Sequence, residues 1–216
     1  MRVLLLGKKD NESVEKAVKF CKNNISELDV NIGRRGESLP EDIGWWKGDY
    51  IISFLSYWIV PDYLLKRAKI AAINFHPASP DYPGTGCYNF VLYEKSADYG
   101  ATCHHMKPEV DAGDIIAVKR FPIYNNDKIK TVIERTYDYL IVLFYEIMAE
   151  ILKGNELPTS KETWKKKATT RKDLNELATI TPDMSQNEIG KRVTATTHDN
   201  WKPIVSLGEY KFELKT

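Results

Sequence analysis

Three apolar runs without polar alternation constrain the fold of this chain more than any other feature. They are "RVLLLG" at residues 2–7, "YIISFL" at 50–55 and "IAAINF" at 70–75. Parallel strands that are covered on both faces lose their polar alternation, so each run is typical of a buried strand. Helical patterns and a further strand-like run, "DVNI", separate them. This alternation predicts a mostly parallel, Rossmann-like sheet flanked by helices.

The helices expected between and after these strands have recognisable ends. The first covers about residues 12–22, with Asp10 as its N-cap. A short helix follows at about 61–69, with Pro61 in its first turn. Further on, "GATCHHM" and "DIIAVKRFPI" predict two more strands, joined by the turn-rich "KPEVDAG". A long amphipathic helix is expected at about 128–152, and Gly154 would end it.

The last part of the chain is more polar and predicts a small α+β lobe. Ser185 and Glu188 form a capping-box pattern ahead of a short helix. "PIVSLGEYKFEL" predicts a β-hairpin with Gly208 at its turn. We therefore expect a core at residues 1–156 and a C-terminal lobe at 157–216. The edge of the hairpin could join two copies in a homodimer.

Composition excludes several classes of partner. The 216 residues carry a formal charge of +1, so no overall field would attract nucleic acid or a membrane surface. No apolar run is long enough for a secretory signal or a membrane span. The three cysteines form no CxxC pair, which argues against a disulfide framework or a zinc site. We expect a cytoplasmic protein without a bound metal.

The chemistry-bearing residues begin with "NFH" at the end of the strand at 70–75. Residues two apart in a strand share a face, so Asn74 and His76 would lie side by side at its carboxyl end. Alone, they are better explained as a turn-capping amide and an ordinary surface histidine. Asp111, in the Gly-containing "VDAGDII" loop, adds a carboxylate. Such a group suits acyl transfer to an amine, with the amide stabilising negative charge and the imidazole exchanging a proton.

Three separated motifs in order resemble the folate-dependent formyltransferase family. They are "NFHPASPDYPGTG", "YGATCHHM" and "VDAGDII", within residues 50–123. The resemblance implies that Asn74, His76 and Asp111 are the catalytic residues, and that 10-formyltetrahydrofolate is the formyl donor. Family members bind the pterin largely through main-chain groups of two loops. These correspond here to Tyr57, Trp58, Ile59 and Val60, and to His105, Met106, Val110 and Asp111.

The acceptor is the less constrained part of this interpretation. "PGTGCYNF" is most similar to the bacterial nucleotide-sugar N-formyltransferases, which formylate amino sugars for surface polysaccharides such as lipopolysaccharide O-antigen. The resemblance therefore implies a nucleotide-linked (dTDP) amino sugar. The alternatives are a glycinamide ribonucleotide formyltransferase and a non-catalytic nucleotide-binding module. The first would have a Gly/Ser-rich phosphate loop where this chain has "LLLGKKDNESVEK".

Two competing branches of the family fit the sequence less well. A methionyl-tRNA formyltransferase would carry a further basic C-terminal domain, whereas about 60 residues follow the expected core. A formyltetrahydrofolate hydrolase would carry a regulatory domain ahead of the first strand.

Candidate acceptor-binding residues follow from the same resemblance. The segment at 85–89 would place the sugar amine, with Thr85, Gly86, Tyr88 and Asn89 as contacts and His104 lining the site. Lys8 and Lys9, at the end of the first strand, could meet a diphosphate. The alternatives without a role in binding are helix packing for Tyr88 and Asn89 and solvent exposure for the two lysines. His104 and His105 would point to opposite faces of their strand, which argues against a shared metal site.

Overall fold

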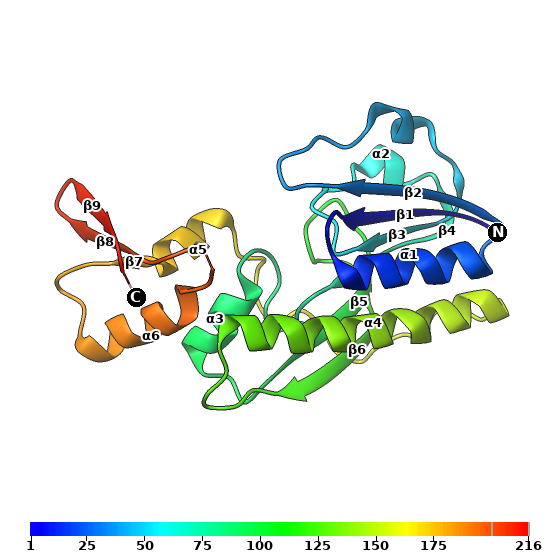
Figure 1. Ribbon diagram of the computed structural model, residues 1–216. Helices are drawn as coiled ribbons and strands as arrows, with labels where there is room; N and C mark the ends of the chain where they lie inside the picture. Colours follow the sequence, from blue (N-terminus) through cyan, green and yellow to red (C-terminus); the bar gives the residue numbers. More distant parts are fainter. Residues whose placement is uncertain (200, 216) are drawn as a thin grey trace.

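A six-stranded sheet with helices on both faces forms the core of the molecule (Figure 1). The computed structural model describes residues 1–199 and 201–215. The strand order is β2-β1-β3-β4-β5-β6, with the first four strands parallel and β5 and β6 antiparallel to their neighbours. The strands are β1 (Arg2–Lys8), β2 (Glu27–Gly33), β3 (Gly48–Phe54), β4 (Ala68–His76), β5 (Asp98–His105) and β6 (Ile115–Pro122). The mostly parallel α/β core expected from the sequence is confirmed.

Strand β1 shows why the apolar runs lack alternation. Val3 and Leu5 pack under α1 (Glu12–Asn24) and α4 (Ile129–Lys153) on one face of the sheet. Leu4 and Leu6 pack on the other face, which is covered by the 3-10 turn η1 (Glu41–Trp45), the short helix α2 (Asp62–Leu65) and the loops beside them. Because both faces are buried, every position of the run must be apolar.

Two helix boundaries differ from the expected ones. The short helix α2 ends at Leu65 and not near 69, and residues 68 and 69 already belong to β4. The N-cap of α1 is Asn11, whose side chain accepts a hydrogen bond from the backbone N–H of Val14. Asp10, the cap expected from the sequence, instead adopts a left-handed conformation (φ 58°) and pairs with Arg34. The cap is therefore one residue later than expected. Gly154 ends α4 with φ 74°, a conformation that glycine adopts without steric cost.

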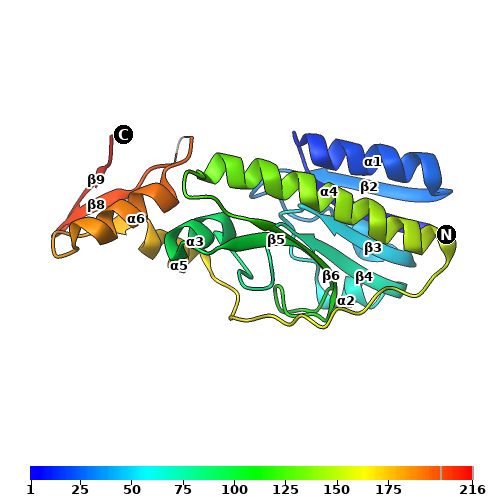
Figure 2. The ribbon, with the colours of Figure 1, turned by 90° about the horizontal axis from the view of Figure 1, so that it is seen from below.

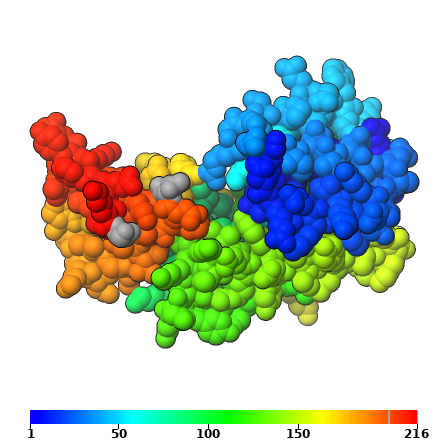
Figure 3. All heavy atoms as spheres, in the orientation of Figure 1, coloured from blue at the N-terminus to red at the C-terminus, as the bar shows by residue number. Residues whose placement is uncertain are grey.

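The described residues of the C-terminal lobe, which is orange to red in Figure 3, form three short strands and two helices. They are α5 (Arg171–Leu177), β7 (Thr179–Ile180), α6 (Gln186–Thr196), β8 (Ile204–Leu207) and β9 (Tyr210–Glu213). The expected hairpin is β8–β9, with Gly208 at its turn (φ 60°). Ser185 caps α6, but Glu188 binds Tyr93 and Arg192 and does not complete the expected capping box. Its contacts tie the lobe to α3 (Cys87–Glu94).

The chain returns along the core before it enters the lobe. This return segment, residues 155–170, runs past β6 (yellow in Figure 2). Backbone hydrogen bonds fix it: Ser160 N–H donates to Ile115, and Lys165 N–H donates to the carbonyl of Pro80. Thr169 bridges to Gly84, whose φ of 90° and close approach to Thr169 leave no room for a side chain. The segment thereby reaches the ends of the strands that carry the polar residues.

Candidate active site

Polar side chains gather where the central strands end. Asn74 in β4 is directly opposite His104 in β5, and beside Ser53 in β3. Residues paired across strands share a face of the sheet, so this register brings the three side chains together. The Asn74 amide lies 3.1 Å from Nε2 of His104. His76, two residues after Asn74, ends the strand and is buried.

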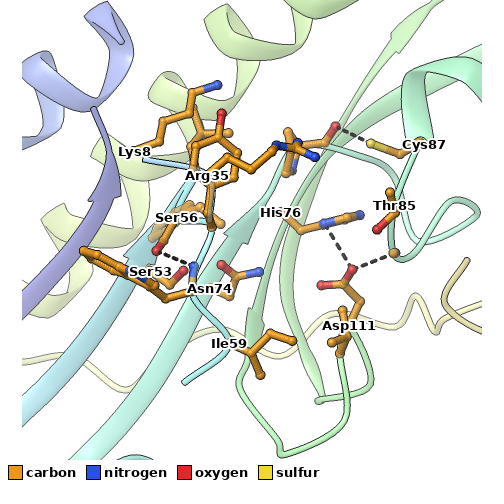
Figure 4. Close-up of a pocket in the computed structure, with 18 of the residues that line it drawn as sticks. Lys8, Arg35, Ser53, Ser56, Ile59, Asn74, His76, Thr85, Cys87 and Asp111 are labelled. Carbon is orange, nitrogen blue, oxygen red and sulfur yellow. Dashed lines mark hydrogen bonds and ion pairs between the residues drawn. The ribbon is translucent and has the colours of Figure 1, made fainter. Parts of the chain in front are cut away.

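Asp111 meets this group from the loop between β5 and β6. Its Oδ2 lies 3.3 Å from Nδ1 of His76 (Figure 4). Its Oδ1 lies 3.3 Å from Nε2 of His104. The backbone N–H of Gly84 donates to Oδ2 at 2.7 Å. The loop passes so close to β5 that a Cβ on Gly113 would lie 1.6 Å from the carbonyl oxygen of His105. The "D-x-G" spacing therefore has a steric cause.

Backbone carbonyls orient both imidazoles. Nε2 of His76 donates to the carbonyl of Tyr82 at 3.1 Å, and Nδ1 of His104 donates to the carbonyl of His105 at 2.8 Å. The remaining ring nitrogens, Nδ1 of His76 and Nε2 of His104, both face Asp111. In the neutral form of His76 this leaves Nδ1 as the basic nitrogen.

His76 and Asp111 are both buried, and each shifts the pKa of the other. Burial lowers the pKa of His76 below 6.5, although the carboxylate of Asp111 and the hydrogen bond to Tyr82 act against this. Burial alone would raise the pKa of Asp111, but the charge of His76, the contact with the His104 imidazole and the hydrogen bond from Gly84 outweigh it and bring it to about 2. At neutral pH the group holds a carboxylate beside a neutral imidazole that can accept a proton.

Trp164, from the return segment, packs against both histidines of this group. Its ring lies edge-to-face with His104 at 5.0 Å and with His76 at 5.9 Å between centroids. Its Nε1–H donates to the carbonyl of Gly113 at 2.7 Å. One side chain thus contacts both histidines and the loop that carries Asp111.

The group opens into a cleft of about 710 Å³ that extends to the C-terminal lobe. Most of the site residues expected from the sequence line it. They are Lys8, Tyr57, Trp58, Ile59, Val60, Asn74, His76, Thr85, Gly86, Tyr88, Asn89, His104, Met106, Val110 and Asp111. Lys9 lies outside, on the groove beside α1. His105 also lies outside, because it follows His104 in β5 and its side chain points to the opposite face.

Some of these side chains have structural partners as well. The buried Asn89 amide donates to the carbonyl of Ala195 at 2.6 Å and so joins α3 to α6. Tyr88 packs on Tyr99, and burial together with Tyr137 raises its pKa well above 10. Asn89 and Tyr88 therefore pack within the fold, as the alternative interpretation predicted, and they also line the cleft.

Comparison with known proteins identifies the family. The sequence profile of the formyl transferase family matches residues 7–144. This chain belongs to the formyl transferase family. A methionyl-tRNA formyltransferase from Limosilactobacillus fermentum is 31% identical over 115 residues, which are 53% of this chain and 36% of that protein. The chain thus matches little more than a third of the length of this relative.

Solved structures confirm the formyl transferase fold over the whole chain. A sugar N-formyltransferase from a Shewanella species superposes with a TM-score of 0.78 at 18% identity, covering 100% of this chain and 97% of that one. An N-formyltransferase from Helicobacter canadensis, in complex with folinic acid and dTDP-3-aminofucose, superposes with a TM-score of 0.72 at 18% identity. That match covers 90% of this chain and 80% of the other.

Residues that sequence reasoning missed complete this formyl transferase cleft. Arg35 and Tyr137 line it, and Trp164 lies behind it. The sequence offered only weak signals for them: Arg35 lies in a Gly-flanked loop and Trp164 in a lysine-rich run, "KETWKKKATTRK", of the kind typical of a solvated face. Residues 161 and 165–167 of that run are indeed exposed.

Two general features of the described residues complete the description. Among residues 1–199 and 201–215, no cluster of three His, Cys, Asp or Glu side chains could hold a metal ion. Within the same residues, no helix is long and apolar enough to cross a membrane.

Proposed function

We propose that this protein is a sugar N-formyltransferase, which transfers a formyl group from 10-formyltetrahydrofolate to the amine of a nucleotide-linked amino sugar. The observation that carries the proposal is the arrangement of Asn74, His76 and Asp111 in the wall of the cleft in a formyl transferase fold. The Helicobacter canadensis enzyme, with folinic acid and dTDP-3-aminofucose bound, supports both substrate classes and a dTDP-linked sugar. Such a product would serve surface polysaccharide synthesis.

Structural similarity supports this branch. The Shewanella sugar N-formyltransferase superposes on the whole chain with a TM-score of 0.78, at 18% identity. Glycinamide ribonucleotide is the second candidate acceptor. Among the described residues, nothing in the triad of Asn74, His76 and Asp111 distinguishes its amine from the amine of an amino sugar.

The cleft has the size and surface that a folate requires. Ligand pockets are commonly about 300–1,000 Å³ and largely apolar. Tyr57, Ile59 and Val110 expose apolar surface at the rim, and Ile59 is 70% exposed without a ligand. We assign Trp58, Val60, Met106 and the main chain around them to the same binding wall. The folate, when bound, supplies the activated formyl group.

The residues of the chain can then divide the work of acyl transfer. The Asn74 amide has one N–H directed at His104, and its second N–H can donate to the formyl oxygen as negative charge develops there. Nδ1 of His76 can take the proton that the attacking amine loses and pass it to the folate nitrogen, which accepts it as its bond to the formyl carbon breaks. Asp111 lies 3.3 Å away and stabilises the intervening imidazolium. Thr85, Gly86 and the other acceptor-facing residues would orient the amine, and this alignment contributes much of the acceleration.

A direct assay tests the proposal. The protein would be incubated with 10-formyltetrahydrofolate and a panel of nucleotide-linked amino sugars, with glycinamide ribonucleotide and methionyl-tRNA as competing acceptors. Mass spectrometry should detect the formyl group on an amino sugar. Asn74→Ala, His76→Ala and Asp111→Asn should each reduce turnover at least about a hundredfold. Asp114→Asn is the matched control, because Asp114 is exposed and its carboxylate pairs with Lys107.

Three results would contradict the proposal. Formylation of glycinamide ribonucleotide or methionyl-tRNA in preference to every amino sugar would assign the acceptor to another class. Near-normal turnover in all three triad variants would remove the catalytic assignment. Nucleotide binding without formyl transfer to any acceptor would favour the non-catalytic binding module.

A further inference from the structure

Two cationic side chains line the cleft away from the triad. Lys8 ends β1, and Arg35 follows the end of the neighbouring strand β2. In Figure 4 they lie together, on the opposite side of His76 from Asp111. Strand β1 lies between β2 and β3, where the strand order reverses. Open α/β sheets bind ligands at the carboxyl ends of strands at such a point.

Neither cation has a carboxylate partner in the described part of the chain. Nζ of Lys8 donates to the Tyr137 hydroxyl and lies 4.5 Å from the centre of its ring. The guanidinium of Arg35 lies over Tyr57 at 5.1 Å. The neighbouring Arg34 is different, since it pairs with Asp10 at 3.0 Å and takes no part in the cleft.

The two charges also act on each other. Burial lowers the pKa of Lys8 to about 8, and the charge of Arg35 adds to this effect. Burial raises the pKa of Tyr137 to about 12, so its hydroxyl stays neutral and only accepts from Lys8. The free protein therefore holds two like charges together without a counterion, which an anionic group would relieve.

The backbone of the turn between β1 and α1 is not available to bind an anion. The side chain of Asn11 already occupies the N–H of Val14 at the start of α1, and Glu12 and Glu15 make that first turn negative. The turn contains no glycine after Lys8, so no Gly-rich loop surrounds a phosphate here. Anion binding at this end of the sheet falls to side chains.

We propose that Lys8 and Arg35 bind the phosphate oxygens of the nucleotide-linked acceptor, with Tyr137 holding Lys8 in position. The inference rests on the proposed function and adds an acceptor contact, Arg35, to the one expected from the sequence. Lys8 has two further N–H donors after its bond to Tyr137, and the planar guanidinium of Arg35 can donate in pairs to phosphate oxygens. The cation pair would fix the phosphates while the sugar amine reaches the triad.

Binding measurements without catalysis test this. Isothermal titration calorimetry would compare dTDP with thymidine on the wild type and on Lys8→Met and Arg35→Gln. We expect dTDP to bind at least about tenfold more weakly to each variant, while thymidine binding is unchanged. Lys8→Arg should keep most of the dTDP affinity. Lys9→Met and Arg34→Gln are matched controls, since both residues lie outside the cleft. Thermal unfolding would verify that each variant is folded.

The possible outcomes separate the subsite from the reaction. If dTDP binds the wild type and both cation variants equally, the subsite is wrong, whatever the formylation assay gives. If the variants lose affinity for folinic acid but not for dTDP, the cations bind the glutamate tail of the folate and the proposal is overturned. If the variants bind dTDP more weakly than the wild type while no amino sugar is formylated, the phosphate subsite is supported and the proposed reaction is wrong.

Discussion

At the scale of single residues, Asp111 combines an unfavourable backbone with an unusually well supported side chain. Its φ of 48° lies in the left-handed region, which costs a non-glycine residue about 1 kcal/mol. The carboxylate is buried, yet it meets two imidazoles and one backbone N–H. These partners offset the desolvation of the charge and hold the strained loop in place. The strained backbone of Asp111 thus places its carboxylate beside His76, the residue that we propose for proton transfer.

The pKa of His76 sets the expected pH dependence. Because burial holds it below 6.5, the acid limb of kcat/KM should have its midpoint below 6.5. The unfolded chain binds this proton first, so the stability gained by keeping His76 neutral is complete above pH 6.5 and is lost as the pH falls. Denaturant titrations across this range should show a smaller loss for His76→Gln. A midpoint clearly above 6.5 would contradict the burial argument.

Gly113 gives a stability prediction at the same scale. A side chain there would collide with the carbonyl oxygen of His105, so Gly113→Ala should destabilise the protein by about 1–3 kcal/mol and displace Asp111. Gly190→Ala is the control. It lies in α6 with open space around it, and should stabilise by up to about 1 kcal/mol. Chemical denaturation measures both, and equal stability of the two variants would refute the steric argument.

At the scale of elements, the return segment is part of the site and not only a connection. Its hydrogen bonds to β6 and to the Pro80–Gly84 loop place Trp164 against both histidines. The same loop carries the N–H that binds Asp111. One extended segment without regular structure therefore contacts His76, His104 and the loop that carries Asp111.

Replacement of Trp164 should separate catalysis from acceptor binding. Trp164→Ala should lower kcat about tenfold or more with little change in the KM of the acceptor, because Trp164 does not line the cleft. Water would reach His76, so its pKa and the acid limb should move up towards 6.5. Trp164→Phe should be intermediate, since it keeps a ring but loses the bond to Gly113. The exposed Lys167→Ala is the control, and a wild-type pH profile in Trp164→Ala would refute this role.

At the scale of the whole molecule, the cleft depends on both ends of the chain. The N-terminal strands supply Lys8 and Ser53, whereas Arg171, Leu174 and Trp201 of the C-terminal lobe line the opposite side. The hydrogen bond from Asn89 to Ala195 and the contact of Tyr93 with Glu188 hold the lobe to α3. The lobe therefore contributes to the shape of the site.

The C-terminal hairpin should also join two copies of the molecule. Strand β9 pairs with β8 and with no other strand of the described residues, and it exposes Tyr210 (65%) and Phe212 (54%). Such an edge favours association with a second copy about a twofold axis. Light scattering should give a dimer for the wild type and a monomer for the double variant Tyr210→Lys, Phe212→Lys. Tyr63→Lys, equally exposed on α2, should leave the dimer intact, and a monomeric wild type would contradict the prediction.

The sequence by itself determined the order of the strands along the chain, their burial and the long helix, because apolar periodicity reports directly which faces are covered. It also determined that Asn74 and His76 share a face, since two residues always do so in a strand. The N-cap of α1 was placed one residue early because Asp10 and Asn11 are equally good caps, and only the backbone conformation separates them.

Only the tertiary structure decided which distant residues meet at the site. The antiparallel register of β4 and β5 set His104 opposite Asn74, and the loop closed by Gly113 carried Asp111 between the two histidines. Trp164 and Arg35 have no periodic pattern, because they lie in segments whose positions depend on hydrogen bonds to remote strands and loops. Periodicity is a local property of the chain, whereas register and loop closure depend on contacts between residues far apart in sequence.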